Sequence, residues 1–158
     1  MFSDTERGYL MRRIMIDAAK CDGCKSCSVA CMQAHRKDDG NVYTLDLTDI
    51  TNESRNFIYK NPDGSYTPVF CRHCEQPECV MSCMSGALKK DEETGHVQYD
   101  AEKCGSCFMC VMNCPYGVLK PDETTHTKVI KCDFCIEKGE EPSCVKACPK
   151  QAIWVEEV

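Results

Sequence analysis

Apolar residues in this chain form short runs that are separated by polar turns. Residues 12–17 (Arg-Arg-Ile-Met-Ile-Asp) and residues 152–155 (Ala-Ile-Trp-Val) have the apolar content of strands. Residues 42–47 alternate apolar and polar side chains, which also predicts a strand. No apolar stretch reaches the length of about 18 residues that a membrane-spanning helix needs, so the sequence predicts no membrane span.

Three hairpins are predicted between these ends, each from two apolar runs on either side of a polar turn. Their paired segments are residues 57–59 with 66–69, 87–88 with 96–99, and 117–119 with 128–130. The first pair encloses Asn61-Pro-Asp-Gly64, which is a strong turn signal. Together with a short helix expected over residues 28–36, the pattern indicates a mixed α and β fold.

Sixteen of the 158 residues are cysteines, and they fall into four groups of four with none left over. Group 1 is Cys21, Cys24, Cys27 and Cys31; group 2 is Cys71, Cys74, Cys79 and Cys83; group 3 is Cys104, Cys107, Cys110 and Cys114; group 4 is Cys132, Cys135, Cys144 and Cys148. Sites made only of thiolates select zinc or iron–sulfur clusters.

Group 3 and Pro115 form a C-x2-C-x2-C-x3-C-P run, which is typical of bacterial iron–sulfur proteins. Three cysteines two residues apart can hold one cluster only on a tight loop. Gly105 tolerates the positive φ that such a loop needs, and Gly23 is expected to do the same in group 1. The fourth cysteine falls where a short helix is expected, which Pro115 ends. The run therefore predicts three ligands for one site and a fourth for another.

Two other uses of so many cysteines compete with this interpretation. A disulfide scaffold suits secreted proteins, but residues 1–9 lack the apolar core of a signal peptide, and no long apolar stretch follows Arg12-Arg13. The cysteines are therefore expected to be reduced ligands in the cytoplasm. Structural zinc sites pair two C-x2-C units across a longer loop, which groups 1 and 3 do not do.

An internal repeat links the groups. The sequence Ile16-Asp-Ala-Ala-Lys-Cys21 resembles Tyr99-Asp-Ala-Glu-Lys-Cys104, and similar residues follow the last cysteines of groups 2, 3 and 4. A unit of strand, cysteine loop, short helix and strand is too small to bury a core of its own. Metal binding must then supply much of the free energy of folding, so the metal-free protein is expected to be unfolded or molten.

In the order of its four motifs, the sequence resembles the four-cluster ferredoxin-like electron-transfer subunits of molybdenum or tungsten oxidoreductases, carbon monoxide dehydrogenases and some hydrogenases. The resemblance covers nearly the whole chain from Arg12 onwards. It implies an α+β fold of two bacterial-ferredoxin-like βαββαβ modules, one inserted in the other. The outer module would comprise residues 12–40 and 120–158 and the inner one residues 71–119, with a β-hairpin insertion at 41–70 and a polar lead-in at 1–11.

The resemblance also implies four [4Fe–4S] clusters with crossed ligation, in which the fourth cysteine of each group serves the cluster of another group. The implied ligands are Cys21, Cys24, Cys27 and Cys148 for cluster A; Cys132, Cys135, Cys144 and Cys31 for cluster B; Cys71, Cys74, Cys79 and Cys114 for cluster C; and Cys104, Cys107, Cys110 and Cys83 for cluster D. Some relatives have tryptophan in place of one cysteine of group 3, but Cys107 is present here. Met84 stands where a proline usually follows the last cysteine of group 2.

The formal charge is −6, from 25 acidic and 19 basic residues, and no basic stripe points to nucleic acid. Four clusters would add roughly −2 each, which favours partners with basic docking patches. No nucleophile with a base, phosphate loop or open metal site is evident, so the protein is not expected to be an enzyme by itself.

The expected role is one-electron transfer between a large catalytic subunit and a downstream electron carrier or flavin subunit. By family analogy, the catalytic subunit would be a tungsten or molybdenum aldehyde-type oxidoreductase or a carbon monoxide dehydrogenase. A free, soluble polyferredoxin shuttle is the main alternative. Head-to-tail self-association between copies is a further possibility, because heterologous contacts need not close.

Other residues near the cysteines are expected to have structural roles. His73 is expected to hydrogen-bond near the ligands rather than to be one, and the remaining histidines to lie at the surface. The methionines beside the cysteines are expected to pack around the clusters. Lys20, Lys103 and Lys131 each precede the first cysteine of a group and are expected to be solvated strand ends, while Trp154 is expected to anchor a core.

Overall fold

The computed structural model describes residues 11–139 and 141–158, which have a mixed α and β fold with small antiparallel sheets. The strands of this part pair two by two: β1 (Arg12–Ile16) with β8 (Ile153–Glu157), β2 (Phe57–Lys60) with β3 (Tyr66–Val69), β4 (Leu88–Lys90) with β5 (Val97–Tyr99), and β6 (Lys120–Pro121) with β7 (Val129–Ile130). The α-helices are α1 (Ser26–His35), α2 (Glu78–Met81), α3 (Met109–Asn113) and α4 (Ser143–Ala147). Short 3₁₀ turns lie at η1 (Ala18–Lys20), η2 (Val42–Thr44), η3 (Ala101–Lys103) and η4 (Ile136–Lys138).

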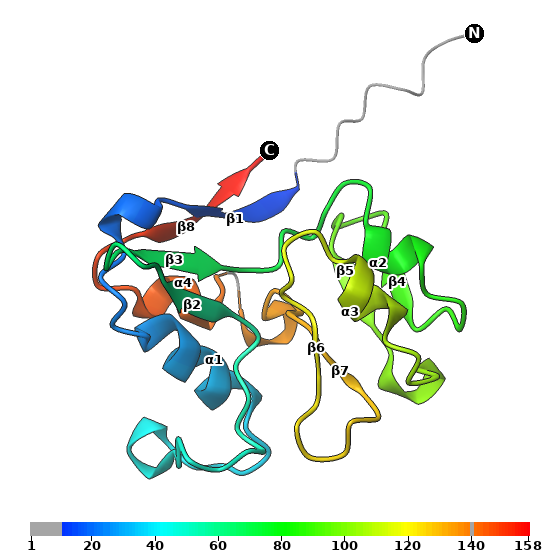
Figure 1. Cartoon of the computed structure of the whole chain (residues 1–158), viewed down its shortest axis with the longest axis horizontal. Helices are drawn as coiled ribbons and strands as arrows, with labels where there is room; N and C mark the ends of the chain where they lie inside the picture. Colours follow the sequence, from blue (N-terminus) through cyan, green and yellow to red (C-terminus); the bar gives the residue numbers. More distant parts are fainter. Residues whose placement is uncertain (1–10, 140) are drawn as a thin grey trace, which may run out of the picture.

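The first and last strands form one antiparallel sheet, so the two ends of the described chain lie side by side (Figure 1). Ile14 stands opposite Val155 in this sheet. Met11 extends the ladder, because its N–H and carbonyl both bond to Val158 at 2.9 Å. Of the lead-in predicted over residues 1–11, only Met11 lies within the described residues, and its side chain is buried.

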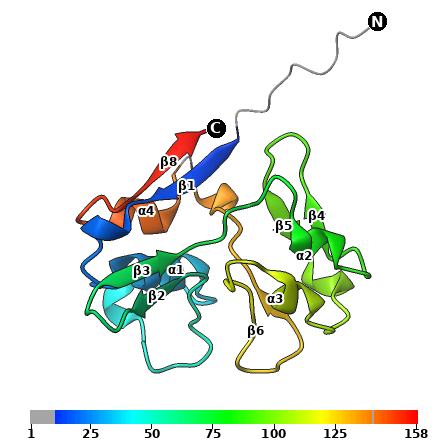
Figure 2. The ribbon, with the colours of Figure 1, turned by 45° about the horizontal axis from the view of Figure 1, so that its top comes forward.

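Buried side chains form two separate cores. The elements that contribute to them occupy two halves of the ribbon, with α1, α4, β1 and β8 in one half and α2, α3, β4 and β5 in the other (Figures 1 and 2). The first core contains Ile14, Cys27, Phe70, Phe134, Cys144, Val145 and Ile153. The second core contains Cys71, Leu88, Val97, Cys110, Val118, Leu119 and Val129. Each core therefore includes two cysteines, which means that the metal sites adjoin the packed interior.

The two cores differ in which segments of the chain form them. The first joins segments from both ends, with α1 packed against α4, whereas the second is built mainly from neighbouring segments, with α2 packed against α3. Val129 of β7 packs in the second core, although the module boundary predicted at residue 120 assigns it to the outer module. The exact boundaries of the modules stay a prediction.

The sequence repeat before groups 1 and 3 corresponds to a repeated local structure. Asp17 and Asp100 each cap a 3₁₀ turn, and their carboxylates accept the backbone N–H two residues further on at 3.1 and 3.0 Å. Each turn ends at the first cysteine of its group, Cys21 or Cys104, whose N–H bonds back into the turn. The aspartate thus fixes the direction from which the chain enters the cysteine loop.

The predicted hairpin over residues 57–69 is confirmed. Strands β2 and β3 pair with Phe57 opposite Val69, and the turn closes with a 3.0 Å bond from the N–H of Gly64 to the carbonyl of Asn61. The hairpin packs over the first cysteine loop, because the ring of Tyr66 lies directly against Gly23.

The strand predicted over residues 42–47 is wrong. The structure has the 3₁₀ turn η2 there, and the side chain of Asn41 accepts the N–H of Tyr43 at 3.0 Å. Asp46 accepts the N–H of Thr48 in the same way at 2.8 Å. These local bonds occupy the backbone donors that a strand would use, and the alternating apolar residues find no partner strand. In the third hairpin, the strand predicted at residues 117–119 is displaced to β6, Lys120–Pro121.

Candidate metal centres

All four cysteine loops share one unusual backbone conformation. The residue directly before the second cysteine has a positive φ in every group, and these residues are Gly23 (74°), His73 (44°), Ser106 (58°) and Phe134 (60°). The prediction that Gly105 adopts this conformation is wrong, because Ser106 does so instead. A left-handed residue among right-handed ones turns successive N–H groups towards one side, which makes a concavity for an anion.

The cysteines of groups 2 and 3 line two cavities. One cavity is lined by Cys83, Cys104, Cys107 and Cys110. A second is lined by Cys71, Cys74, Cys79 and Cys114. Their matching sets of four cysteines suit one kind of group. In each cavity, three cysteines come from one group and the fourth comes from the other group.

Groups 1 and 4 approach each other where α1 packs against α4. Burial raises the pKa of Cys27 to about 11, and the nearby thiols of Cys148 and Cys21 contribute to this shift. Burial also raises the pKa of Cys144, again with contributions from neighbouring thiols, first Cys31 and then Cys135. The last cysteines of groups 1 and 4 thus lie beside the other group, as they do in groups 2 and 3.

The residues present fit iron–sulfur clusters. Each of the two cavities offers four thiol side chains, and the loops of groups 2 and 3 each have a left-handed residue of the kind that favours an anion-binding concavity. Burial raises the pKa of Cys79 to about 11, so the metal-free site holds neutral thiols that must lose protons when a metal binds. An anionic iron–sulfur cluster bound through thiolates is the kind of group that these cavities could hold.

The four groups adjoin one another through the two cores. Cys132 of group 4 packs against the second core, which contains Cys71 of group 2. Cys27 of group 1 and Cys144 of group 4 lie together in the first core. Since groups 2 and 3 share two cavities, the four groups form one continuous series in the order 1, 4, 2, 3.

Backbone N–H groups of the described residues donate to cysteine sulfur. The N–H of Arg55 lies 3.2 Å from Sγ of Cys31, and the N–H of Phe134 lies 3.3 Å from Sγ of Cys132. Cys31 belongs to group 1, and Cys132 belongs to group 4. Hydrogen bonds to sulfur are one of the factors that set cluster potentials.

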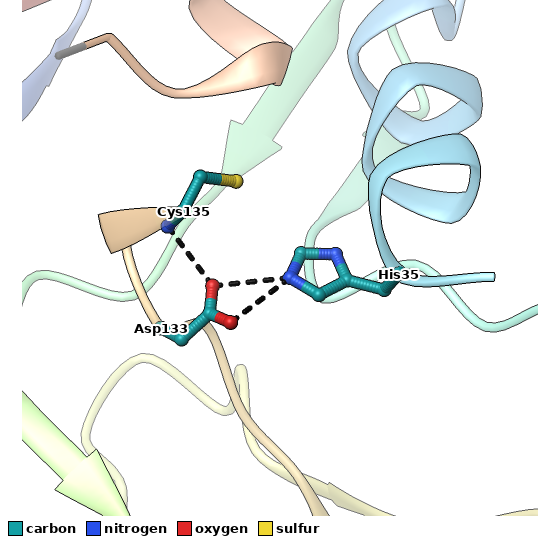
Figure 3. A group of neighbouring side chains, drawn as sticks. All are labelled: His35, Asp133 and Cys135. Atoms are coloured by element: carbon teal, nitrogen blue, oxygen red, sulfur yellow. Dashed lines mark hydrogen bonds and ion pairs between the residues drawn. The ribbon is translucent and has the colours of Figure 1, made fainter. Parts of the chain in front are cut away.

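A histidine and an aspartate beside these sulfur atoms were not predicted (Figure 3). His35 of α1 lies with Nε2 3.0 Å from Oδ1 of Asp133, and its Nδ1 is 3.7 Å from Sγ of Cys31. Burial opposes the charge on His35, but the bonds to Asp133 and then to Cys31 raise its pKa to about 10. Potential ligand atoms of His35, Asp133 and Cys135 lie within 4.8 Å of one another. Cys135 belongs to group 4, so His35 and Asp133 are neighbours of the site of that group.

Several expectations for the remaining residues are wrong. His96 is buried rather than at the surface, and its ring stacks on Phe134 with centroids 4.2 Å apart. Met81, Met84 and Met112 are exposed by 73, 94 and 77% instead of packing around the sites. Trp154 lies on β8 with its side chain partly in solvent, so it does not anchor a core.

His73 hydrogen-bonds to the backbone of β5 rather than to a cysteine. It is almost fully buried, it lines the cavity of group 2, and its Nδ1 accepts the N–H of Val97 at 3.0 Å. Because a backbone N–H occupies Nδ1, a proton on the neutral ring lies on Nε2. Burial lowers the pKa of His73 well below its usual value, so the ring is neutral.

Comparison with known proteins gives the family. Residues 62–158 match the model of the 4Fe-4S dicluster domain. The protein belongs to this family of ferredoxin-type iron–sulfur proteins of electron transport. The match contains groups 2, 3 and 4 in full, and the relatives described below extend the similarity to group 1.

Several known proteins are similar over most of this chain. It is 39% identical to the NADH-dependent phenylglyoxylate dehydrogenase subunit beta of Aromatoleum evansii, over 92% of this chain but only 30% of that protein. It is 34% identical to the electron transport protein HydN of Escherichia coli K12, over 90% of this chain and 86% of HydN. It is also 34% identical to the B subunit of the anaerobic dimethyl sulfoxide reductase of the same strain, over 87% of this chain and 69% of that subunit.

A solved structure also resembles this chain. A chain of the active site complex BamBC of benzoyl coenzyme A reductase, in a structure with zinc, is 28% identical and superposes with a TM-score of 0.52. The superposition covers 94% of this chain and 79% of the other. Among the described residues, no helix has the length and apolar character needed to cross a membrane.

Proposed function

We propose that the protein is an electron-transfer subunit that carries four [4Fe–4S] clusters and relays single electrons between a large catalytic oxidoreductase subunit and a downstream carrier or flavin subunit. One observation carries most of this proposal. Cys83 lines the cavity of group 3, and Cys114 lines the cavity of group 2. Such an exchange of the fourth cysteine is the arrangement of two-cluster ferredoxins.

The proposed ligands are the four sets that the family resemblance implies. Two of these sets coincide with the cysteines of the two cavities. For the other two, support comes from the thiols that surround Cys27 and Cys144. On this basis we also propose two ferredoxin-like modules, one inserted in the other, since β1 and β8 pair around the segment that contains groups 2 and 3.

When bound, each cluster would supply a centre that accepts and releases one electron. The residues of the protein would hold these centres next to one another in the order of groups 1, 4, 2 and 3. They would also exclude water from the sulfur atoms, because Cys27, Cys71, Cys110 and Cys144 are buried. A set of close, shielded centres suits electron relay and offers no position for a substrate.

The catalytic partner is proposed from resemblance. The similar proteins include a subunit of a dehydrogenase and a subunit of a reductase, and a similar chain occurs in an active site complex. We therefore propose a catalytic oxidoreductase subunit as partner, of the tungsten or molybdenum aldehyde type or a carbon monoxide dehydrogenase. A cytoplasmic location belongs to the same proposal, because reduced thiols are needed to bind clusters. Head-to-tail contacts between copies would be an addition to this arrangement.

A free electron shuttle is the second candidate. HydN, of which this chain covers 86%, is named an electron transport protein without mention of a subunit. Anaerobic purification from the native host distinguishes the two functions. Recovery in a stable complex with a large catalytic subunit would support the first, and recovery as a single soluble protein would contradict it.

The number of clusters and the crossed ligation can be tested on the isolated protein. Four [4Fe–4S] clusters require roughly 16 iron atoms per protein molecule, with broad brown absorption, whereas zinc would give a colourless protein. Cys110→Ser and Cys114→Ser alter two residues only four positions apart, one within α3 and one directly after it. We expect electron paramagnetic resonance to show a different cluster perturbed in each variant. Loss of the same cluster signal in both would contradict the crossing.

A further inference from the structure

Three lysines precede the first cysteine of a group, and the structure separates one of them from the others. Lys20 and Lys103 are exposed, and each forms an ion pair with an aspartate three residues earlier, at 3.8 and 3.4 Å. Lys131 is only 5% exposed. The sequence places Lys128 rather than an aspartate three residues before it, so this lysine lacks the local anion that the other two have.

The ammonium of Lys131 lies between two cysteine groups. Its Nζ donates to the carbonyls of Val97 and Cys132, both at 2.8 Å, and to Sγ of Cys71 at 3.6 Å. An ammonium has three donors, so all of them are used. Among the described residues, no carboxylate forms an ion pair with Lys131.

A buried cation without an anion is strongly unfavourable, even when its hydrogen bonds are satisfied. The atom that can supply the missing negative charge is the sulfur of Cys71, once it is a metal-bound thiolate. Lys131 also contacts group 4, because its Nζ donates to the carbonyl of Cys132. The lysine thus faces ligands of groups 2 and 4 together.

We propose that Lys131 is the internal cation that raises the reduction potentials of two neighbouring clusters, the one bound by Cys71 and the one bound by Cys132. This inference rests on the proposed ligand sets. A cluster becomes more negative when it gains an electron, so a fixed positive charge at hydrogen-bond distance from its ligand stabilises the reduced form more than the oxidised form. The lysine sits where groups 2 and 4 meet, so the middle of the series is made easier to reduce than its ends.

The test is a redox titration of the iron-loaded protein followed by electron paramagnetic resonance. Lys131→Met keeps the length of the side chain and removes its charge and donors, whereas Lys131→Arg keeps the charge. We expect Lys131→Met to lower the ratio of reduced to oxidised protein at least tenfold for two clusters at fixed potential, which equals a shift of about 59 mV for one electron. Lys131→Arg should shift both midpoints by much less.

Lys20→Met and Lys103→Met are the matched controls, because each removes a lysine at the same position of another group. Both should leave all midpoints within about threefold of wild type, since exposed, ion-paired charges are screened. Iron content is measured on every variant. A shortage of iron in the wild-type protein would contradict the proposed function, whereas full iron content with unchanged midpoints in Lys131→Met would overturn only the inference.

A second variant covers the case in which Lys131→Met fails to load iron. Lys131→Gln keeps a donor for the carbonyl of Val97 and lacks the charge, so it should load and show the same fall in potential. Unchanged midpoints in Lys131→Gln would overturn the inference. If both neutral variants fail to hold iron while Lys131→Arg loads fully, the charge serves assembly instead of potential, and the inference is again overturned.

Discussion

Gly23 and Gly105 are both glycines between the first two cysteines of a group, yet only the position of Gly23 requires a glycine in the structure. Gly23 has a φ of +74°, and a Cβ atom added to it would overlap the ring of Tyr66. Gly105 has no positive φ, and a Cβ atom there would meet nothing within 4 Å. Alanine substitutions at these two positions therefore form a matched pair that tests the loop geometry.

The expected destabilisation of Gly23→Ala has two parts. A left-handed conformation costs a residue with a Cβ atom about 1–2 kcal/mol, and forcing the atom against the ring of Tyr66 costs about 1–3 kcal/mol more. The sum of about 2–5 kcal/mol corresponds to a fall in melting temperature of about 4–20 °C for a protein of this size. Gly105→Ala should change the free energy of unfolding by less than about 0.5 kcal/mol.

The assay is thermal unfolding of the iron-loaded protein under anaerobic conditions, followed by circular dichroism and by visible absorption. Tyr66→Ala separates the two parts, because in its background Gly23→Ala should keep only the cost of the left-handed conformation, about 1–2 kcal/mol. Equal stability losses in Gly23→Ala and Gly105→Ala would refute this account. A full loss of about 2–5 kcal/mol in the Tyr66→Ala background would refute the contact between ring and glycine.

Three further predictions concern the same sites. Removing iron by chelation should abolish cooperative unfolding and the dispersion of amide signals in nuclear magnetic resonance; a cooperative metal-free protein would contradict the role given to the metal. Reconstitution should be more complete near pH 8.5 than near pH 6.5, because burial raises the pKa of Cys79 to about 11 and the thiol must release its proton to bind iron; a constant iron yield would contradict this sign. Ser28→Ala should destabilise the loaded protein by about 1–3 kcal/mol in chemical denaturation, because the buried Oδ1 of Asn56 loses its 2.6 Å bond from Ser28, whereas the exposed Ser65→Ala should be nearly neutral.

Cysteine spacing carried most of what could be predicted about the site. The interval of three residues before the last cysteine predicted a short helix there. Helix α3 ends at Asn113, and Cys114 directly after it lines a different cavity from its neighbours. The hairpins followed from turn signals such as Asn61-Pro-Asp-Gly64 because local bonds decide such turns. These features depend on residues close in the sequence, which is why the sequence alone could indicate them.

The errors arose where distant or competing contacts decide the structure. Asn41 and Asp46 bond to backbone N–H groups and override the alternating pattern of residues 42–47. The left-handed position falls on Ser106 beside an available glycine, because the loop fixes the position and not the residue type. Lys131 looks like Lys20 in sequence, and only the packing of groups 2 and 4 around it makes it an internal cation.

The pairing of β1 with β8 has a consequence for how the protein is made. Ile16 leaves the ribosome long before its partner Ile153, roughly 7–27 s earlier at about 5–20 residues per second. During that interval β1 presents an unpaired strand edge, which is a template for association with other proteins. Groups 2 and 3 lie between these strands, so all of their cysteines have emerged before β8 is made. Biosynthesis thus favours completing the interior of the sequence first and adding the sheet that joins its ends last.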